Sequence, residues 1–194
     1  WSRSRLLIVA NPRPPPTRSA GIPIVATMVS FKHVARTGAE FTFREPSDGD
    51  EKALMSFINS VIAEPMSGLM MSRKASLKEE QQWLSSRLSE IRSRATVILL
   101  VVEGDRILGS CHISRLSGKH SHRASIGVAL RKEVRGMGLG EALMRKTLEL
   151  GVRRFRGIES IDLSAFDYND RALALYRKLG FQSLDSYRIS YFQR

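Results

Sequence analysis

The stretch Leu130-Arg-Lys-Glu-Val-Arg-Gly-Met-Gly-Leu-Gly-Glu-Ala-Leu-Met144 decides the fold of this chain. A strand-like run gives way to a helix-like run through three alternating glycines, Gly136, Gly138 and Gly140. Glycine accepts positive φ angles, and the first helical turn offers unpaired N–H groups with partial positive charge. The segment therefore predicts a strand–loop–helix unit that binds a phosphate or pyrophosphate. A glycine turn with a purely structural role is the alternative interpretation.

Two common nucleotide-binding loops do not fit this spacing. A dinucleotide fingerprint needs G-x-G-x-x-G, but Glu141 stands where that pattern continues, and no first βαβ unit precedes it. A P-loop needs G-x-x-x-x-G-K-[ST], and the sequence contains no such run. Neither of these two nucleotide-binding loops is therefore present in this segment.

The residues before the glycine loop alternate between strand and helix patterns. We expect a strand over 41–44, a helix capped by Ser47 or Asp48, and a second helix that begins with the capping-box pair Ser76 and Glu79. Apolar runs predict consecutive strands over 97–102, 107–113 and 124–130, the first two joined as a hairpin.

A second informative segment runs from Asn169 to Phe181, after a strand predicted around 158–166. Asn169 is a favourable helix N-cap, and Gly180 can end the helix before a final strand that includes Tyr187, Ile189 and Tyr191. Tyr176 falls in the middle of this helix. Taken alone, that tyrosine is more typical of a core aromatic than of a catalyst.

The two segments together resemble the signatures of the GNAT superfamily of N-acetyltransferases. Arg135 to Gly140 matches R-x-x-G-x-G, and Asn169 to Phe181 matches N-x-x-A-x-x-L-Y-x-K-x-G-F. The resemblance covers roughly residues 40–192 and is strongest over 128–181. It implies an α/β (α+β) fold with a mixed, mostly antiparallel central sheet, helices on both faces and a V-shaped cofactor cleft.

The resemblance also implies a site for acetyl-CoA and a reaction. By this resemblance, Tyr176 is the general acid that protonates the leaving thiolate, and Asn169 orients the cofactor. Arg135 would contact phosphate oxygens, and the backbone of the preceding strand would bind the pantetheine arm and the acetyl carbonyl. The expected cofactor-binding set is Val128, Ala129, Leu130, Arg135, Gly136, Met137, Gly138, Leu139, Gly140, Asn169 and Tyr176. We expect direct attack by a primary amine in a ternary complex.

The general base, the acceptor and the class of function stay open at this point. Glu64, His122, Asp162 and Asp167 are candidate bases. The acceptor is either a small-molecule amine or a protein N-terminus, as in the ribosomal-protein alanine acetyltransferase branch. The alternatives to an enzyme are a non-catalytic acyl-CoA sensor and a basic nucleic-acid-binding domain. A homodimer is left open, and no metal site is expected, because His120 and His122 lack further ligands nearby.

Composition indicates one globular domain, with 42% hydrophobic and 26% charged residues. Six basic residues and no acidic one precede Glu40, which is half of the net charge of +12 and weakens the nucleic-acid interpretation. We expect residues 1–39 to be a basic, Pro-containing, flexible extension, with a targeting segment as the alternative, and residues 40–194 to form the domain. Cys111 has no disulfide partner, which favours the cytoplasm. No apolar run is long enough to span a membrane.

Overall fold

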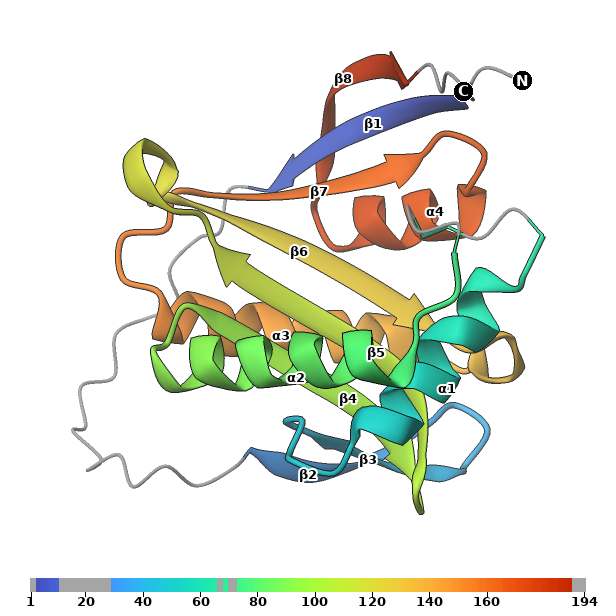
Figure 1. Cartoon of the computed structure of the whole chain (residues 1–194). Helices are drawn as coiled ribbons and strands as arrows, with labels where there is room; N and C mark the ends of the chain where they lie inside the picture. Colours follow the sequence, from blue (N-terminus) through green and yellow to red (C-terminus); the bar gives the residue numbers. More distant parts are fainter. Residues whose placement is uncertain (1–2, 11–28, 66–67, 70–72, 190–194) are drawn as a thin grey trace.

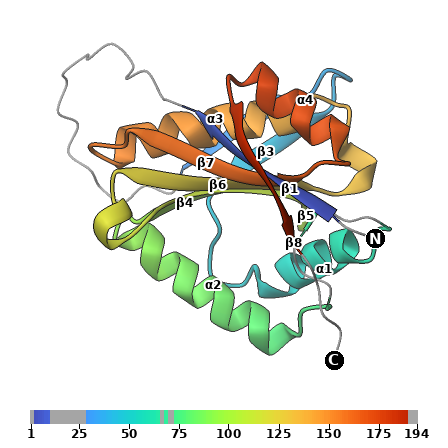
Figure 2. The same ribbon diagram turned by 90° about the horizontal axis from the view of Figure 1, so that it is seen from above.

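The computed structural model describes residues 3–10, 29–65, 68–69 and 73–189, and it shows one mixed sheet between two layers of helices. Helices α1 and α2 cover one face, and α3 and α4 cover the other (Figure 1, Figure 2). The strands are β1 (Arg3–Ala10), β2 (Ser30–Val34), β3 (Glu40–Arg44), β4 (Thr96–Glu103), β5 (Arg106–Arg115), β6 (Arg123–Leu130), β7 (Ser160–Phe166) and β8 (Gln182–Ile189). The helices are α1 (Glu51–Ile62), α2 (Leu77–Arg92), α3 (Leu139–Arg154) and α4 (Asp170–Lys178), with short 3₁₀ turns at Gly118–His120 and Lys132–Val134.

The strand order is β2-β3-β4-β5-β6-β7-β1-β8. Every neighbouring pair is antiparallel except β6 and β7, which run parallel. The expected mixed, mostly antiparallel sheet with helices on both faces is confirmed, and so is the hairpin between β4 and β5.

The core has two parts, one on each face of the sheet. Strand β4 contributes to both, because successive side chains of a strand point to opposite faces. Val97, Leu99 and Val101 pack in the cluster that includes α3, whereas Ile98 and Leu100 pack in the cluster with α1 and α2. This explains why β4 reads as an unbroken apolar run instead of an alternating one.

Local capping signals determine where the helices begin. Ser76 and Glu79 form the predicted capping box of α2, because each side chain bonds to the other residue's backbone N–H. The predicted cap of α1 at Ser47 or Asp48 is wrong by two or three residues, because the N-cap is Asp50. The Asp50 carboxylate accepts two hydrogen bonds of 2.7 Å from Arg44 and one of 2.8 Å from the backbone N–H of Ser47. Those contacts fix the turn that leads into α1.

The expectation for residues 1–39 needs correction. The structure places β1 between β7 and β8, pairs β2 with β3, and buries Ala35 in the core, so this region contributes to the sheet. The five consecutive apolar residues over 6–10 suit a strand that has a neighbouring strand on each side. This run is the physical reason that the segment joins the sheet instead of forming an extension. The proline-rich stretch Asn11–Pro16 lies outside the described residues. Within the described part of the chain, no helix has the length and apolar character needed to cross a membrane.

Candidate active site

A cavity opens where β6 and β7 separate. The two strands pair over three residues each, from Arg123 opposite Ser160 to Ser125 opposite Asp162. Beyond that point β6 continues against β5 and β7 continues against β1, so the strands diverge (Figure 1). The resulting cavity has a volume of about 710 Å³ and is lined by both strands, the glycine loop and α4. This is the predicted V-shaped cleft.

The backbone of β6 presents polar groups to the cavity. The N–H of Arg131 donates to the carbonyl oxygen of Leu108 in β5, at 2.8 Å. Because backbone groups of alternate residues point to opposite edges of a strand, Val128 and Leu130 direct theirs toward the side that β7 has left. Val128, Ala129 and Leu130, which the family resemblance assigns to cofactor binding, all line the cavity.

The glycine loop has the conformation that its sequence requires. Gly136 and Gly138 have φ angles of +88° and +85°, and Gly138 is the N-cap of α3. Gly140 lets the helix approach the strand closely, because a Cβ built there would lie 3.3 Å from Cδ1 of Leu130. All three glycines line the cavity, and this confirms the predicted strand–loop–helix unit.

Two predicted cofactor-binding residues are placed differently. Leu139 is fully buried in the core on the α3 side of the sheet and anchors the start of the helix. Met137 packs against the same core, and its carbonyl oxygen accepts a hydrogen bond of 3.1 Å from the N–H of Arg36. Neither side chain lines the cavity, so any contact that these residues make with a ligand is through the backbone.

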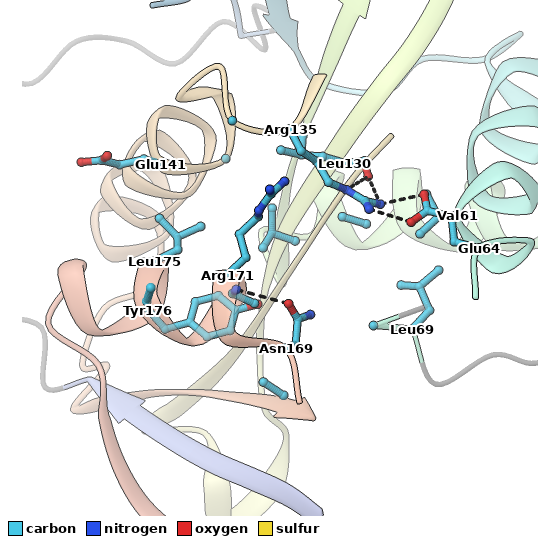
Figure 3. Close-up of a pocket in the computed structure, with 18 of the residues that line it drawn as sticks. Val61, Glu64, Leu69, Leu130, Arg135, Glu141, Asn169, Arg171, Leu175 and Tyr176 are labelled. Carbon is cyan, nitrogen blue, oxygen red and sulfur yellow. Dashed lines mark hydrogen bonds and ion pairs between the residues drawn. The ribbon is translucent and has the colours of Figure 1, made fainter. Parts of the chain in front are cut away.

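Arg135 lines the cavity, but four of the five N–H groups of its guanidinium donate to protein oxygens (Figure 3). It donates two hydrogen bonds to the carboxylate of Glu64, at 2.6 and 2.8 Å. It also donates two to the carbonyl oxygen of Leu130, at 3.0 and 2.7 Å. The arginine expected to contact phosphate therefore ties the end of β6 to the segment after α1.

Asn169 caps the start of α4 and Tyr176 lies within it, and both line the cavity. The side-chain oxygen of Asn169 accepts from the N–H of Ala172 at 3.3 Å, which confirms the predicted cap. Tyr176 is 7% exposed, and its ring packs edge-to-face on Phe181 with centroids 6.2 Å apart. Figure 3 shows its phenol directed into the cavity beside Asn169.

The surroundings of Tyr176 keep its hydroxyl protonated. Burial raises the pKa of Tyr176 to about 12, and the nearby thiol of Cys111 adds to the effect. A phenol with that pKa is neutral at physiological pH and can donate a proton.

Among the four candidate bases, Glu64 lines the cavity, and Arg135 holds both of its oxygens. Asp162 lies where β6 and β7 separate, and one of its oxygens accepts a hydrogen bond from Arg123. His122, Asp162 and Asp167 are not among the described residues that line the cavity.

Three cationic side chains at the cavity were missed by the sequence analysis as binding residues: Arg36, Arg171 and Lys178. Arg171 extends from the first turn of α4 into the cavity (Figure 3). The sequence did offer one signal for Arg171 as a binding residue, because it lies two positions after the predicted cap Asn169. Arg36 lies within residues 1–39, for which the sequence predicts a flexible extension, and no local pattern marks it as a binding residue.

Comparisons with known proteins agree with this geometry. The model of the acetyltransferase (GNAT) family matches residues 63–181. A ribosomal-protein-alanine N-acetyltransferase from Brucella melitensis is 19% identical, with a TM-score of 0.65 over 74% of this chain and 85% of that one. A ribosomal-protein-S5-alanine acetyltransferase from Vibrio fischeri is 16% identical, with a TM-score of 0.64 over 79% and 83%. A phosphinothricin acetyltransferase from Sinorhizobium meliloti, solved with acetyl-CoA, is 17% identical, with a TM-score of 0.61 over 73% and 75%.

Curated protein sequences gave no significant match. The family model nevertheless spans more than half of the sequence and includes both the glycine loop and the α4 segment. The chain therefore belongs to the GNAT family of acetyltransferases.

Proposed function

We propose that this chain transfers the acetyl group of acetyl-CoA to a primary amine by direct attack, with both substrates bound at once. The observation that carries the proposal is that one cavity is lined by the glycine loop at the N-terminus of α3 and by a phenol whose pKa is raised by burial. The loop suits the diphosphate of a coenzyme, and the phenol suits a leaving thiolate.

The cavity residues fit acetyl-CoA in character as well as in size. A volume of about 710 Å³ is within the usual range of small-molecule sites. The phosphate end has the start of α3 and the cations Arg36 and Lys178. The interior has apolar surface from Val128 and Leu175, which suits the pantetheine arm.

Val128 and Tyr176 perform the chemistry in this proposal. The N–H of Val128 stabilises negative charge on the acetyl carbonyl oxygen while the amine nitrogen forms a bond to the carbonyl carbon. As the carbon–sulfur bond breaks, the hydroxyl of Tyr176 donates its proton to the sulfur. The amine nitrogen gives up its extra proton to solvent water, and solvent returns a proton to the tyrosinate. General acid catalysis of this kind contributes about 10²–10⁴-fold to the rate.

The acceptor is a primary amine of a small molecule or of a protein N-terminus. The Brucella and Vibrio neighbours are alanine acetyltransferases of ribosomal proteins, and the Sinorhizobium neighbour is named for a small molecule, so the fold supports both classes. The positive net charge favours acceptors that are not polycations, because like charges repel.

The test is to incubate the protein with acetyl-CoA and a panel of small amines and N-terminal peptides. We expect thiol release coupled to the mass gain of one acetyl group on at least one acceptor, and a large loss of rate in Tyr176→Phe. Tight binding of acetyl-CoA without transfer to any acceptor would instead support the acyl-CoA sensor.

A further inference from the structure

The turn between β2 and β3 is fastened to the glycine loop. The N–H of Arg36 donates to the carbonyl oxygen of Met137 at 3.1 Å, and this joins residues about 100 positions apart. The turn itself is closed by the N–H of Ala35, which donates to the oxygen of Ala39 at 2.8 Å. Ala35 is buried in the core, so the backbone of Arg36 has a fixed position against the loop.

The side chain of Arg36 continues from that position over the N-cap of α3. A Cβ built on Gly138 would lie 3.0 Å from Nε and 3.2 Å from Cγ of Arg36. The guanidinium then reaches Glu141 in the first turn of α3, with Nη2 3.3 Å from Oε2. The Arg36 side chain is 66% exposed and lines the cavity, so it has room to meet a ligand.

Positive charge is in excess at this place. The Glu141 carboxylate accepts hydrogen bonds from Lys178 at 2.6 Å and from Arg145 at 3.1 Å, in addition to Arg36. One negative charge therefore faces three positive ones, beside a helix N-terminus that itself attracts anions. The arginine of the glycine-loop motif, Arg135, adds nothing to this excess, because Glu64 pairs with it.

We propose that Arg36 is a phosphate-binding residue for the acetyl donor, supplied by the β2–β3 turn. The inference rests on the proposed function, since it takes acetyl-CoA as the ligand. The family model matches residues 63–181 and so does not include this turn. The guanidinium exchanges its long contact with Glu141 for charge-assisted hydrogen bonds to a phosphate oxygen, which its planar donors suit.

The test compares Arg36→Gln with Lys32→Gln. Lys32 lies on the same hairpin, and its exposed side chain pairs with Glu40 at 3.3 Å, so the control removes an equal charge without touching the loop. Binding of acetyl-CoA and of acetyl-pantetheine, which lacks the nucleotide phosphates, is measured by calorimetry at low and high salt. We expect Arg36→Gln to weaken acetyl-CoA binding about tenfold, by less at high salt, and to leave acetyl-pantetheine binding unchanged.

Three results would overturn the inference. Equal loss of acetyl-CoA affinity in Lys32→Gln would show that the effect is one of overall charge. Equal loss for acetyl-pantetheine in Arg36→Gln would show that the turn has only a structural role. Unchanged acetyl-CoA affinity in Arg36→Gln would show that the residue does not contact phosphate. If the unaltered protein bound no acetyl-CoA at all, the proposed function itself would fail first.

Discussion

Replacing Arg135 with Gln tests how the cavity is held open. The substitution removes the ion pair with Glu64 and leaves the carbonyl oxygen of Leu130 without its two donors. The two side chains of the ion pair are 27% and 19% exposed, so the pair is shielded from solvent more than a surface pair is, although not fully buried. We expect a loss of about 2–3 kcal/mol in the free energy of unfolding, between the values for exposed and buried pairs.

The assay is urea unfolding of the single variants Arg135→Gln and Glu64→Gln and of the double variant. Since both side chains belong to one interaction, the double variant should lose less than the sum of the singles, with a coupling of about 1–2 kcal/mol. The melting temperature of Arg135→Gln should fall by about 5–10 °C for a chain of this length. Arg153→Gln is the control, because it breaks an exposed pair with Glu149 and should cost less than about 1 kcal/mol.

Additive losses in the double variant would refute this reasoning about the ion pair. So would an Arg135→Gln protein of normal stability that had lost affinity for acetyl-CoA. That second result would return Arg135 to the phosphate-binding role that the family resemblance implied.

Three further predictions concern Tyr176, Gly138 and Cys111. Tyr176→Phe should lower kcat about 10²-fold or more with little change in KM for acetyl-CoA, and the rate of the unaltered enzyme should show no decline from Tyr176 ionisation below about pH 10, since its pKa is raised to about 12. Gly138 and Gly157 both have positive φ, so replacing either with Ala should lower the free energy of unfolding by ~1–2 kcal/mol through backbone strain. Gly138→Ala should lower it further and should also weaken acetyl-CoA binding, because a Cβ at Gly138 also meets the Arg36 side chain. Burial raises the pKa of Cys111 from 9.0 to about 12, so the thiol ionises more readily in the unfolded chain than in the folded one. The free energy of unfolding should therefore fall by about 1–2 kcal/mol between pH 8 and pH 10. Urea unfolding at each pH measures this change, which should be smaller in Cys111→Ala.

The parts of the site that the sequence predicted depend on short-range interactions. The Asn169 cap bonds three residues ahead, and the Ser76–Glu79 capping box spans the same distance. The positive φ angles of Gly136 and Gly138 are likewise a local property of the loop. Such features leave a signature in a few consecutive residues, so a pattern can reveal them.

The parts that the sequence did not predict depend on contacts between distant residues. Arg135 and Glu64 are 71 positions apart, and Arg36 and Glu141 are 105 apart. The residues next to Arg135 and Arg36 in sequence do not specify whether each side chain faces solvent, a ligand or a carboxylate. The insertion of β1 between β7 and β8 is of the same kind, because strand order depends on the whole sheet and a single apolar run does not specify its partners.

The divergence of β6 and β7 is unfavourable, because it leaves backbone groups of both strands without their partners in the sheet. The side chains that compensate for this at each end of the opening determine which backbone groups a ligand can reach. Separating two strands leaves backbone N–H and C=O groups unpaired at both edges, and each such group is unfavourable when buried. At the far end of β6, Arg135 satisfies the Leu130 carbonyl; at the point of separation, the pair between Arg123 and Asp162 spans the two strands. Charged side chains thus lie at both ends of the opening. Under the proposed function, the edge at Val128, between them, is where the thioester of acetyl-CoA binds. A ligand that bonds there supplies the partner that β7 would have provided, so binding at this edge is favoured by the same requirement that normally closes a sheet.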